Sequence, residues 1–350
     1  MESTADLSIE DLIAVERMVI TVTHSGYIKR TAADLYRRQK RGGKGSRGMA
    51  AKEEDWIERL FIGATHDYIL FFTNRGKAYW LKVYSIPEGG RASKGRPIVN
   101  LLDLEGGEDI KAMIPVAEFK GDNFIIMATK KGQVVKNRLS DYGNPRKIGI
   151  KAVKVAQNDE LMGVKLTDGT NEILMATRCG MAIRFHESKV RPMGRFTGGV
   201  RGITLAPKDE VIGLVAATAE SSILTVCERG YGKRTRLDEY RQTNRGGKGV
   251  INIRATERNG PVMGVLQVLD QDQIIAITEQ GVSIRYNVSE LRELSRATQG
   301  VRLIDVAEGD RLASLARIEE SEEEENGGEE DEEAQAEGAA PDEGGGDAGE

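Results

Sequence analysis

The sequence repeats itself six times, and this periodicity limits the possible folds more than any other feature. An apolar stretch ending in T-x-x-G, or C-x-x-G in one copy, recurs along the chain. Its glycine falls at Gly26, Gly76, Gly132, Gly180, Gly230 and Gly281. Successive glycines are 50, 56, 48, 50 and 51 residues apart. Such a period is typical of repeat architectures, in which each repeat forms one structural unit.

Each copy has the pattern of a β-hairpin. Apolar and polar residues alternate on both sides of the glycine, as in strands buried on one face. The glycine falls where a tight turn requires a positive φ angle. A second glycine follows 19 residues later in five repeats and 17 residues later in the third, at Gly149. Two further apolar segments complete the repeat, so we predict four strands per repeat, as in a propeller blade.

We therefore predict an all-β fold, a six-bladed β-pinwheel that resembles a propeller and has four-stranded blades. Closing six units into a ring protects their sheet edges, which favours a ring over the alternative of a linear β-solenoid. The predicted blades are residues 18–65, 66–119, 120–169, 170–220, 221–271 and 272–318. Residues 1–17 form a leader whose first part has a helical pattern. Residues 319–350 are rich in Glu, Asp, Gly and Ala and are predicted to be a disordered acidic tail.

The net charge of −5 hides a basic body. Residues 319–350 hold 16 of the 55 acidic residues and no Lys or Arg, which leaves 39 acidic against 50 basic residues, about +11, in residues 1–318. A basic body is suited to a polyanionic partner, although a solvated surface would have the same composition. The tail is either a solvating terminus or a mimic of DNA that competes for the basic body. Under the second hypothesis, its deletion should tighten DNA binding.

The composition argues against several other classes of protein. Cys179 and Cys227 are too few for a disulfide framework or a four-cysteine zinc site, and the 3 histidines lack metal-ligand spacing. We find no catalytic arrangement that would support an enzyme with a site in the ring's channel. No apolar run approaches the roughly 18 residues of a membrane span, and a signal peptide is not evident. We predict a cytoplasmic protein without a metal site.

Cationic residues recur at one position of the repeat. Four residues after the hairpin glycine, the chain has Arg30, Trp80, Lys136, Arg184, Arg234 and Arg285. Because this position is equivalent in every blade, we predict a belt of charge around the ring that binds the phosphates of duplex DNA. Neighbouring residues extend the predicted belt: Lys29, Arg75, Lys77, Lys130, Lys131, Arg178, Arg229 and Lys233. Aromatic residues make up only 5% of the chain, which argues against single-strand stacking and for duplex DNA.

A glycine-rich basic loop marks the first repeat. It reads Gln39-Lys40-Arg41-Gly42-Gly43-Lys44-Gly45 and follows Arg37 and Arg38. Adjacent glycines let backbone N–H groups approach an anion closely, and the flanking cations add charge. A Walker A loop is excluded because Gly45, rather than Ser or Thr, follows Gly43-Lys44. The G-x-G-x-x-G match at residues 43–48 lacks the βαβ context of a dinucleotide site.

The heptad closely resembles the gyrase A box, whose usual form is QRRGGKG. The six repeats resemble the C-terminal β-pinwheel of the bacterial DNA gyrase A protein over about residues 9–318. Lys40 replaces the usual Arg and keeps the charge. An imperfect copy at residues 242–249 includes Arg245 and Lys248, and we predict that it is mainly a blade turn that also adds charge. The alternatives are a topoisomerase IV-like DNA-binding domain, which lacks an intact box, and a propeller-type protein-interaction module.

The resemblance implies a function in DNA topology. In gyrase, this domain wraps DNA with positive handedness, and ATP-driven strand passage introduces negative supercoils. The implied partners are duplex DNA, the N-terminal part of the gyrase A protein and the gyrase B protein in an A2B2 holoenzyme, with the isolated fragment monomeric. The resemblance implies that this fragment has no catalytic residue and no cofactor, because the cleavage tyrosine, ATP and Mg²⁺ belong to other parts of the holoenzyme. The implied location is the bacterial cytoplasm, at the nucleoid.

Overall fold

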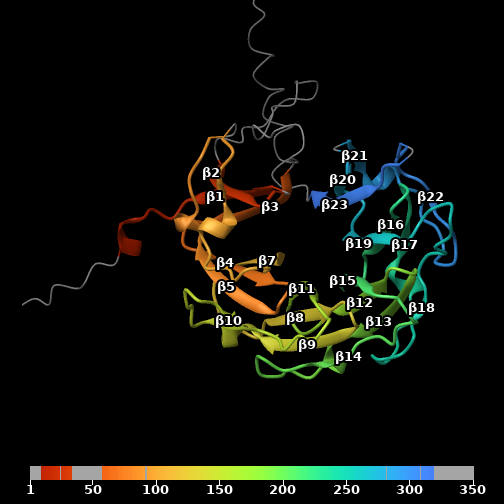
Figure 1. Cartoon of the computed structure of the whole chain (residues 1–350), viewed down its shortest axis with the longest axis horizontal. Helices are drawn as coiled ribbons and strands as arrows, with labels where there is room; N and C mark the ends of the chain where they lie inside the picture. Colours follow the sequence, from red (N-terminus) through yellow and green to blue (C-terminus); the bar gives the residue numbers. More distant parts are fainter. Residues whose placement is uncertain are drawn as a thin grey trace, which may run out of the picture.

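The computed structural model describes residues 9–23, 25–33, 57–90, 93–280, 282–307 and 309–318. Figure 1 shows six small sheets that follow one another around a ring in chain order. Over the described residues, five sheets have four strands and the sixth has three. The first and last sheets are neighbours, because β3 (Ile57–Ala64) lies against β23 (Leu312–Ile318). The predicted all-β ring is therefore confirmed, and the solenoid alternative is wrong.

Each repeat contributes an antiparallel hairpin and a closing strand. The hairpins are β1–β2 (Arg17–Thr23, Tyr27–Ala32), β4–β5 (Tyr68–Thr73, Lys77–Lys82), β8–β9 (Phe124–Thr129, Gln133–Arg138), β12–β13 (Glu172–Thr177, Met181–His186), β16–β17 (Ser222–Cys227, Tyr231–Arg236) and β20–β21 (Gln273–Thr278, Ser283–Asn287). The other closing strands are β7 (Ile110–Val116), β11 (Leu161–Thr167), β15 (Val211–Ala217) and β19 (Val262–Val268). Closing strands of neighbouring blades contact one another and surround the centre of the ring.

A short strand from each of the second to sixth repeats completes the preceding blade. These exchange strands are β6 (Arg96–Pro97), β10 (Ile150–Lys151), β14 (Val200–Arg201), β18 (Val250–Ile251) and β22 (Val301–Arg302). They pair with β2, β5, β9, β13 and β17, respectively, and form the outer edges of those sheets. The outer loop is the segment leading to each exchange strand, at residues 86–95, 143–149, 190–199, 240–249 and 291–300. The first five blades are therefore built from two repeats each, and within the described residues the second to sixth repeats contain the predicted four strands.

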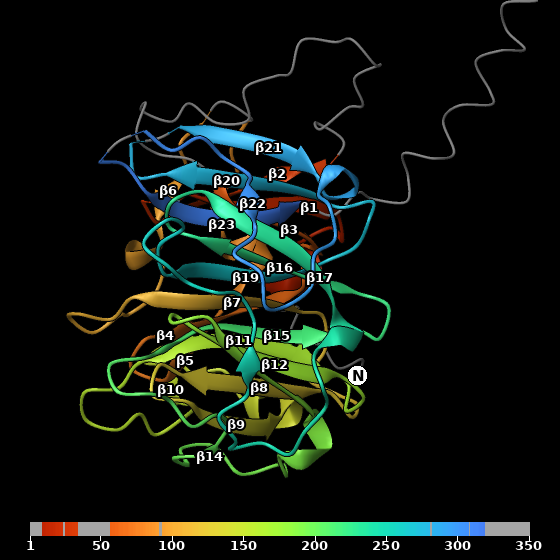
Figure 2. The same cartoon turned by 90° about the vertical axis from the view of Figure 1, so that its right-hand side faces the viewer.

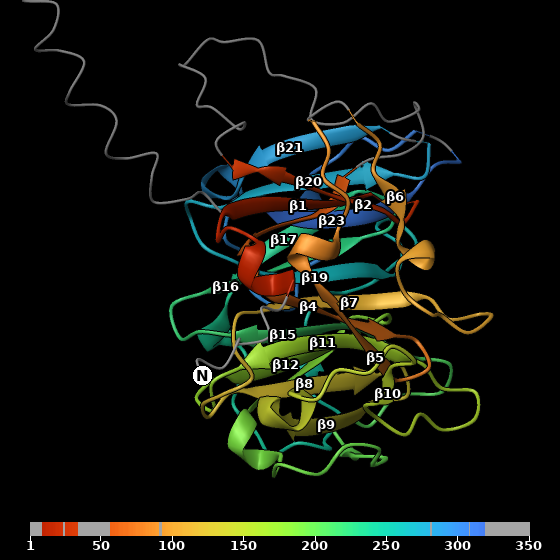
Figure 3. The same cartoon turned by 90° about the vertical axis from the view of Figure 1, so that its left-hand side faces the viewer.

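The two faces of the ring carry different connections. Figures 2 and 3 view the ring edge-on and show the strands running from one face to the other. The hairpin turns lie on one side, which we call the turn face. The links between repeats lie on the other, the connection face, with a 3-10 helix after most hairpins. The 3-10 helices are η1 (Ile9–Leu12), η3 (Val83–Ser85), η4 (Ile98–Asn100), η5 (Leu139–Tyr142), η6 (Glu187–Lys189), η7 (Leu237–Glu239) and η8 (Val288–Glu290). None of the helices in the described ranges is long and apolar enough to cross a bilayer.

Turn chemistry explains the T-x-x-G motif. Gly76 has a φ of 77° and donates its N–H to the carbonyl oxygen of Thr73 at 2.9 Å. The hydroxyl of Thr73 accepts a hydrogen bond from the N–H of Lys77 at 3.3 Å. The second periodic glycine has another reason: a Cβ on Gly249 would lie 2.3 Å from the carbonyl oxygen of Ala182. The second glycine therefore marks the close crossing of an exchange strand over the preceding blade.

The hydrophobic core lies in layers between neighbouring blades. Ile69 and Phe71 of β4 join the cluster shared with the first blade, whereas Leu70 and Phe72 join the cluster shared with the third. All four side chains are fully buried. The prediction that the hairpin strands are buried on one face is therefore wrong for β4, because this blade is covered on both faces by its neighbours.

Candidate nucleic-acid interface

The residues four positions after the hairpin glycine occupy equivalent places in the six blades. Arg30 pairs with Ile20 and Arg184 with Leu174, each in the second strand of its hairpin. The same register holds for Trp80, Lys136, Arg234 and Arg285. The predicted equivalence of this position is confirmed.

In the first two blades, these side chains reach toward the next repeat. Arg30 donates from Nε to the carbonyl oxygen of Ile86 at 2.8 Å, and its Nη2 lies 3.1 Å from Oε2 of Glu88. Trp80 donates from Nε1 to the carbonyl oxygen of Tyr142 at 2.8 Å. Both contacts hold the segment that follows the next hairpin, so this position fastens one blade to its neighbour.

The third blade makes the same connection through a buried ion pair. Nζ of Lys136 lies 2.5 Å from Oε2 of Glu187 in η6, and the two side chains are 4% and 0% exposed. The Glu187 carboxylate also accepts hydrogen bonds from the hydroxyl of Thr167 at 2.9 Å and from the N–H of Gly169 at 2.9 Å. Nζ of Lys136 lies 4.0 Å from the centroid of the Phe124 ring. The Lys136 charge is thus satisfied inside the protein.

The fourth and fifth blades complete the pattern. Arg184 donates to the carbonyl oxygen of Leu237 at 2.8 Å, and Nε of Arg234 lies 4.0 Å from Oε1 of Glu293. Arg285 of the sixth blade is exposed. The expectation of a solvent-exposed belt at this position is therefore wrong for Lys136 and Arg234, which are 3% and 8% exposed, because their side chains serve contacts between blades.

Two further lysines of the predicted belt are buried under outer loops. Lys29 donates from Nζ to the carbonyl oxygen of Gly90 at 2.9 Å, and Lys233 donates to those of Ser295 and Arg296, each at 2.6 Å. Loss of hydration on burial lowers the pKa of both lysines, and lowers the pKa of Lys233 to about 7. These ammonium groups hold outer loops in place and do not face the surface.

The remaining predicted cations lie in or directly after the hairpin turns on the turn face. They are Arg75, Lys77, Lys130, Lys131, Arg178 and Arg229. Acidic residues offset part of this charge: Nζ of Lys77 lies 2.6 Å from Glu105, and Nζ of Lys130 lies 2.9 Å from Glu160. Hydrogen bonds from these lysines lower the pKa of both carboxyls.

A larger set of exposed cations lies in the outer loops and exchange strands, and the sequence prediction included only one of them. We call these residues the rim cations: Arg96, Arg146, Lys147, Lys151, Arg191, Arg195, Arg201, Arg241, Lys248 and Arg292. Within the described ranges, none of them forms an ion pair with an acidic residue. They therefore present positive charge that is not held in ion pairs along the outer edges of successive blades, although the charge of Lys151 also acts on the carboxyl of Glu105.

The sequence did contain a cationic pattern in the outer loops and exchange strands that carry the rim, although only some of its members are rim cations. Arginine stands four residues before the second glycine in five repeats, at Arg41, Arg91, Arg195, Arg245 and Arg296. In several repeats a cation also stands two residues after the second glycine, as at Lys151, Arg201 and Arg302. The sequence prediction compared only cations close to the hairpin glycine. It missed this pattern because these cations belong to the later segment, which crosses to the preceding blade.

Hydrogen bonds join neighbouring outer loops into a continuous rim. The hydroxyl of Thr204, after β14, donates to the carbonyl oxygen of Gly246 at 2.7 Å, and the N–H of Gly246 donates to the carbonyl oxygen of Gly202 at 2.5 Å. Arg296 likewise donates from Nη1 to the carbonyl oxygen of Ile251 at 3.0 Å. The rim cations are therefore carried on loops that are fixed to one another.

The first glycine-rich loop, Gln39–Gly45, lies outside the described residues together with Arg37, Arg38 and the tail at 319–350. Its imperfect copy at 242–249 is the outer loop of the fifth repeat. There, Gly246 has a φ of 84°, and Lys248 is exposed on the outer edge. The copy thus has both predicted features, a blade turn and an added surface charge.

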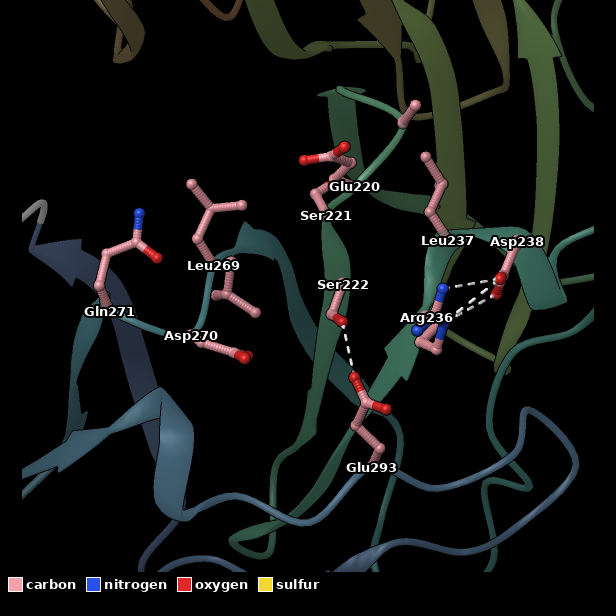
Figure 4. A pocket seen from close by; sticks show the side chains of 12 residues that line it. Glu220, Ser221, Ser222, Arg236, Leu237, Asp238, Leu269, Asp270, Gln271 and Glu293 are labelled. Atoms are coloured by element: carbon pink, nitrogen blue, oxygen red, sulfur yellow. Dashed lines mark hydrogen bonds and ion pairs between the residues drawn. The ribbon is translucent and has the colours of Figure 1, made fainter.

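A hollow on the connection face has the wrong charge for a phosphate. It lies beside the fifth blade and has a volume of about 360 Å³ (Figure 4). The carboxylates of Glu220, Asp238, Asp270 and Glu293 line it. Arg236 lies 3.1 Å from Asp238 and is therefore already paired. The acidic hollow does not extend the basic rim.

The cysteines have different environments. Burial raises the pKa of Cys227 to about 12, so its thiol stays protonated at neutral pH. Cys179 is exposed, and its pKa is raised chiefly by loss of hydration. In the part of the chain that the structure describes, no three His, Cys, Asp or Glu side chains are grouped to hold a metal ion.

The fold and surface define a class of protein: a ring of strand-exchanged β-blades with a basic outer rim. A family model described as "DNA gyrase C-terminal domain, beta-propeller" matches residues 17–62, 67–117, 123–168, 171–218, 221–268 and 272–319. The chain belongs to this family.

Curated relatives agree with this assignment, and solved structures share the fold. The DNA gyrase A protein of Salmonella typhimurium is 48% identical over 318 residues, and that of Haemophilus influenzae is 43% identical over 344. These alignments cover 91% and 90% of this chain but 36% and 39% of the relatives, so the chain spans little more than a third of their length. The C-terminal domain of DNA topoisomerase IV superposes with a TM-score of 0.75 at 28% identity, covering 88% of this chain and 94% of that one. A DNA gyrase A C-terminal domain superposes with a TM-score of 0.70 at 24% identity, covering 87% and 100%.

Proposed function

We propose that this chain binds, bends and wraps duplex DNA around its outer rim, as the C-terminal domain of a DNA gyrase A protein. The observation that carries the proposal is the position of the rim cations. They lie on the outer edges of successive blades, on loops that are hydrogen-bonded to one another, and in the described ranges they form no ion pairs with acidic residues. Membership of the gyrase C-terminal domain family supports the same function.

The rim has the charge that bending requires. Bending 20–30 base pairs by 40–90° costs on the order of 1–6 kcal/mol, and each phosphate contact releases counterions from the DNA. A series of contacts along a curved edge offsets the bending energy. Because phosphates are common to every sequence, binding should depend weakly on base identity and more on the ease with which DNA bends.

In this proposal, the chain works as part of a larger enzyme. Its partners are duplex DNA, the N-terminal part of the gyrase A protein and the gyrase B protein in an A2B2 holoenzyme. DNA cleavage and ATP hydrolysis with Mg²⁺ take place in those other parts, and this segment needs no cofactor of its own. The holoenzyme uses the wrapped DNA to introduce negative supercoils in the bacterial cytoplasm, at the nucleoid.

The rim assignment is tested by the salt dependence of binding. Replacing Arg146, Arg201 and Lys248 together with Ala should remove three phosphate contacts. The slope of log K against log salt should then become shallower by about 2.7, at roughly 0.9 per contact. Fluorescence anisotropy of a labelled duplex at several salt concentrations would measure it.

The matched control removes three cations from the turn face. Arg75, Lys130 and Lys131 are replaced with Ala in the same background. Although the sequence placed these residues in the predicted belt, they lie away from the outer edges that carry the rim cations, so the slope should change by less than about 0.9, the effect of one contact. An equal loss from both variants would contradict a path along the outer rim.

A topoisomerase IV-like domain that binds DNA without wrapping it is a second candidate, favoured by the superposition with that enzyme's C-terminal domain. Ligation of nicked circular DNA in the presence of the chain separates the two. Wrapping leaves a change in linking number after the protein is removed, whereas binding without writhe leaves none. Under the gyrase proposal, replacing Lys40, Arg41 and Lys44 with Ala should abolish that change while the fold persists.

A further inference from the structure

Phe196 in the outer loop of the fourth repeat has an unusual backbone conformation. Its φ is +59°, in the left-handed region that bulky residues rarely adopt. Its side chain is nevertheless 48% exposed, so burial of the ring is incomplete. An aromatic residue held in this conformation with half of its surface in solvent is a candidate for a contact with a partner.

The neighbouring repeat holds this conformation in place. The N–H of Phe196 donates to the carbonyl oxygen of Ala152 at 2.9 Å, and the carbonyl oxygen of Thr197 accepts from the N–H of Lys154 at 3.0 Å. At the equivalent position of the fifth repeat, the chain has Gly246, with a φ of 84°. The fourth and fifth repeats therefore share a left-handed residue at this position, and the fourth repeat has phenylalanine where the fifth has glycine.

The ring is surrounded by positive charge. Nζ of Lys151 lies 4.7 Å from the centroid of the Phe196 ring, and the adjacent Arg195 is exposed. Residues 143–156 and 190–201, which form this part of the rim, contain no Asp or Glu. An exposed apolar ring beside cations that form no ion pairs fits duplex DNA, in which stacked apolar base pairs lie between two rows of phosphates.

We propose that Phe196 is a wedge that contacts the bases of duplex DNA through the minor groove and partly opens one base step. The flanking cations hold the phosphates on either side, and the ring kinks the duplex toward the major groove as it passes the rim between the third and fourth blades. This inference rests on the proposed function and adds a local kink to a path that phosphate contacts alone would bend smoothly.

The main test compares three variants at this position. Phe196→Asn keeps a residue that tolerates left-handed backbone and removes the apolar ring, so it should weaken duplex binding about tenfold. Its salt slope should be unchanged because no phosphate contact is lost. Energy transfer across an end-labelled duplex of about 30 base pairs should report a smaller bend. Phe196→Leu keeps an apolar wedge and should stay within about threefold of the parent protein.

The third variant reports insertion directly. The indole of Phe196→Trp should be quenched by duplex DNA and protected from iodide, when compared with the parent protein, which has Trp56 and Trp80. Leu166→Asn is the matched control, because Leu166 is also an exposed apolar residue but lies on closing strand β11. It should not alter binding or bending.

The outcomes separate this inference from the proposed function. If the parent protein binds and bends DNA and Phe196→Asn does so equally well, the wedge is overturned and the proposed function stands. An indole that iodide still quenches in the complex would also overturn it. Failure of the parent protein to bind duplex DNA would overturn the proposed function itself.

Discussion

Arg245 donates a hydrogen bond from Nη1 to the carbonyl oxygen of Arg201 at 3.1 Å, so the outer loop of the fifth repeat fastens the exchange strand of the fourth. Its Nε donates to the carbonyl oxygen of Lys189 at 3.0 Å. Lys248 in the same loop is exposed. The two cations of this glycine-rich loop thus have different tasks, since one holds the rim together and the other faces solvent.

Arg245→Ala should lower the free energy of unfolding by about 1–2 kcal/mol, because two carbonyl oxygens lose a charged donor. Urea denaturation followed by circular dichroism would measure the loss. DNA binding should weaken as well, because the loop that carries Lys248 is released. A variant with full stability would show that these hydrogen bonds do not hold the rim.

Lys248→Ala should leave stability unchanged and make the salt slope of DNA binding shallower by about 0.9, the effect of one lost phosphate contact. Lys120→Ala is the control, because Lys120 is 87% exposed but lies on the connection face. Titrations of a labelled duplex at four salt concentrations would compare the two. Equal slopes for Lys248→Ala and the parent protein would remove Lys248 from the DNA path.

Gly249→Ala should destabilise the fifth repeat by about 1–3 kcal/mol. The residue has a φ of 76°, and an added Cβ would lie 2.3 Å from the carbonyl oxygen of Ala182. Gly247→Ala is the matched control two residues away. Its added Cβ would make only ordinary van der Waals contacts, the nearest with Ile183 at 3.6 Å. Denaturant midpoints should separate the two variants, and similar midpoints would contradict the close crossing.

Glu187→Ala should lower the free energy of unfolding by about 3–5 kcal/mol, because it leaves the buried Lys136 ammonium without its partner. Glu187→Leu combined with Lys136→Met should recover most of this loss, since no charge then remains to be buried. Chemical denaturation of the single and double variants forms the comparison. A double variant as unstable as the single one would show that the hydrogen bonds lost by Thr167 and Gly169, rather than the orphaned charge, are responsible.

Lys233 should make stability depend on pH. Its pKa is lowered to about 7 in the folded protein from an ordinary value of 10.5. Between these values the unfolded state binds the proton more readily, so the contribution of Lys233 to stability rises with pH. Below about pH 7 both states are protonated, and the penalty for burying the charge is fully present.

Lys233→Met removes this titration and leaves the other groups in place. The difference in Tm between the parent protein and the variant should shift in favour of the parent as pH rises from 7 to 10. Differential scanning calorimetry at several pH values would measure it. A difference that stays constant would mean that the folded pKa of Lys233 is close to its ordinary value.

The sequence was informative wherever a physical requirement repeats at a fixed spacing. Gly76 gives its hairpin turn a positive φ, and a glycine recurs at this position in all six repeats, so the motif located every hairpin. The recurring cation at Arg30 and Arg184 also has a structural cause, but spacing could not distinguish a side chain that binds phosphate from one that fastens two blades. That distinction depends on the neighbouring repeat, which supplies the carbonyl oxygens and the carboxylates.

The sequence by itself determined the number of blades, their hairpins and the ring they form, because strand periodicity and turn chemistry are local properties. Only the tertiary structure decided which strand completes which blade and which cations reach solvent. Gly249 and Arg201 show the reason: each acquires its role from a segment of another repeat, through a close backbone approach at Gly249 and a place on the exposed outer edge at Arg201. Exposure and partnership are set by contacts between repeats, and no single repeat contains them.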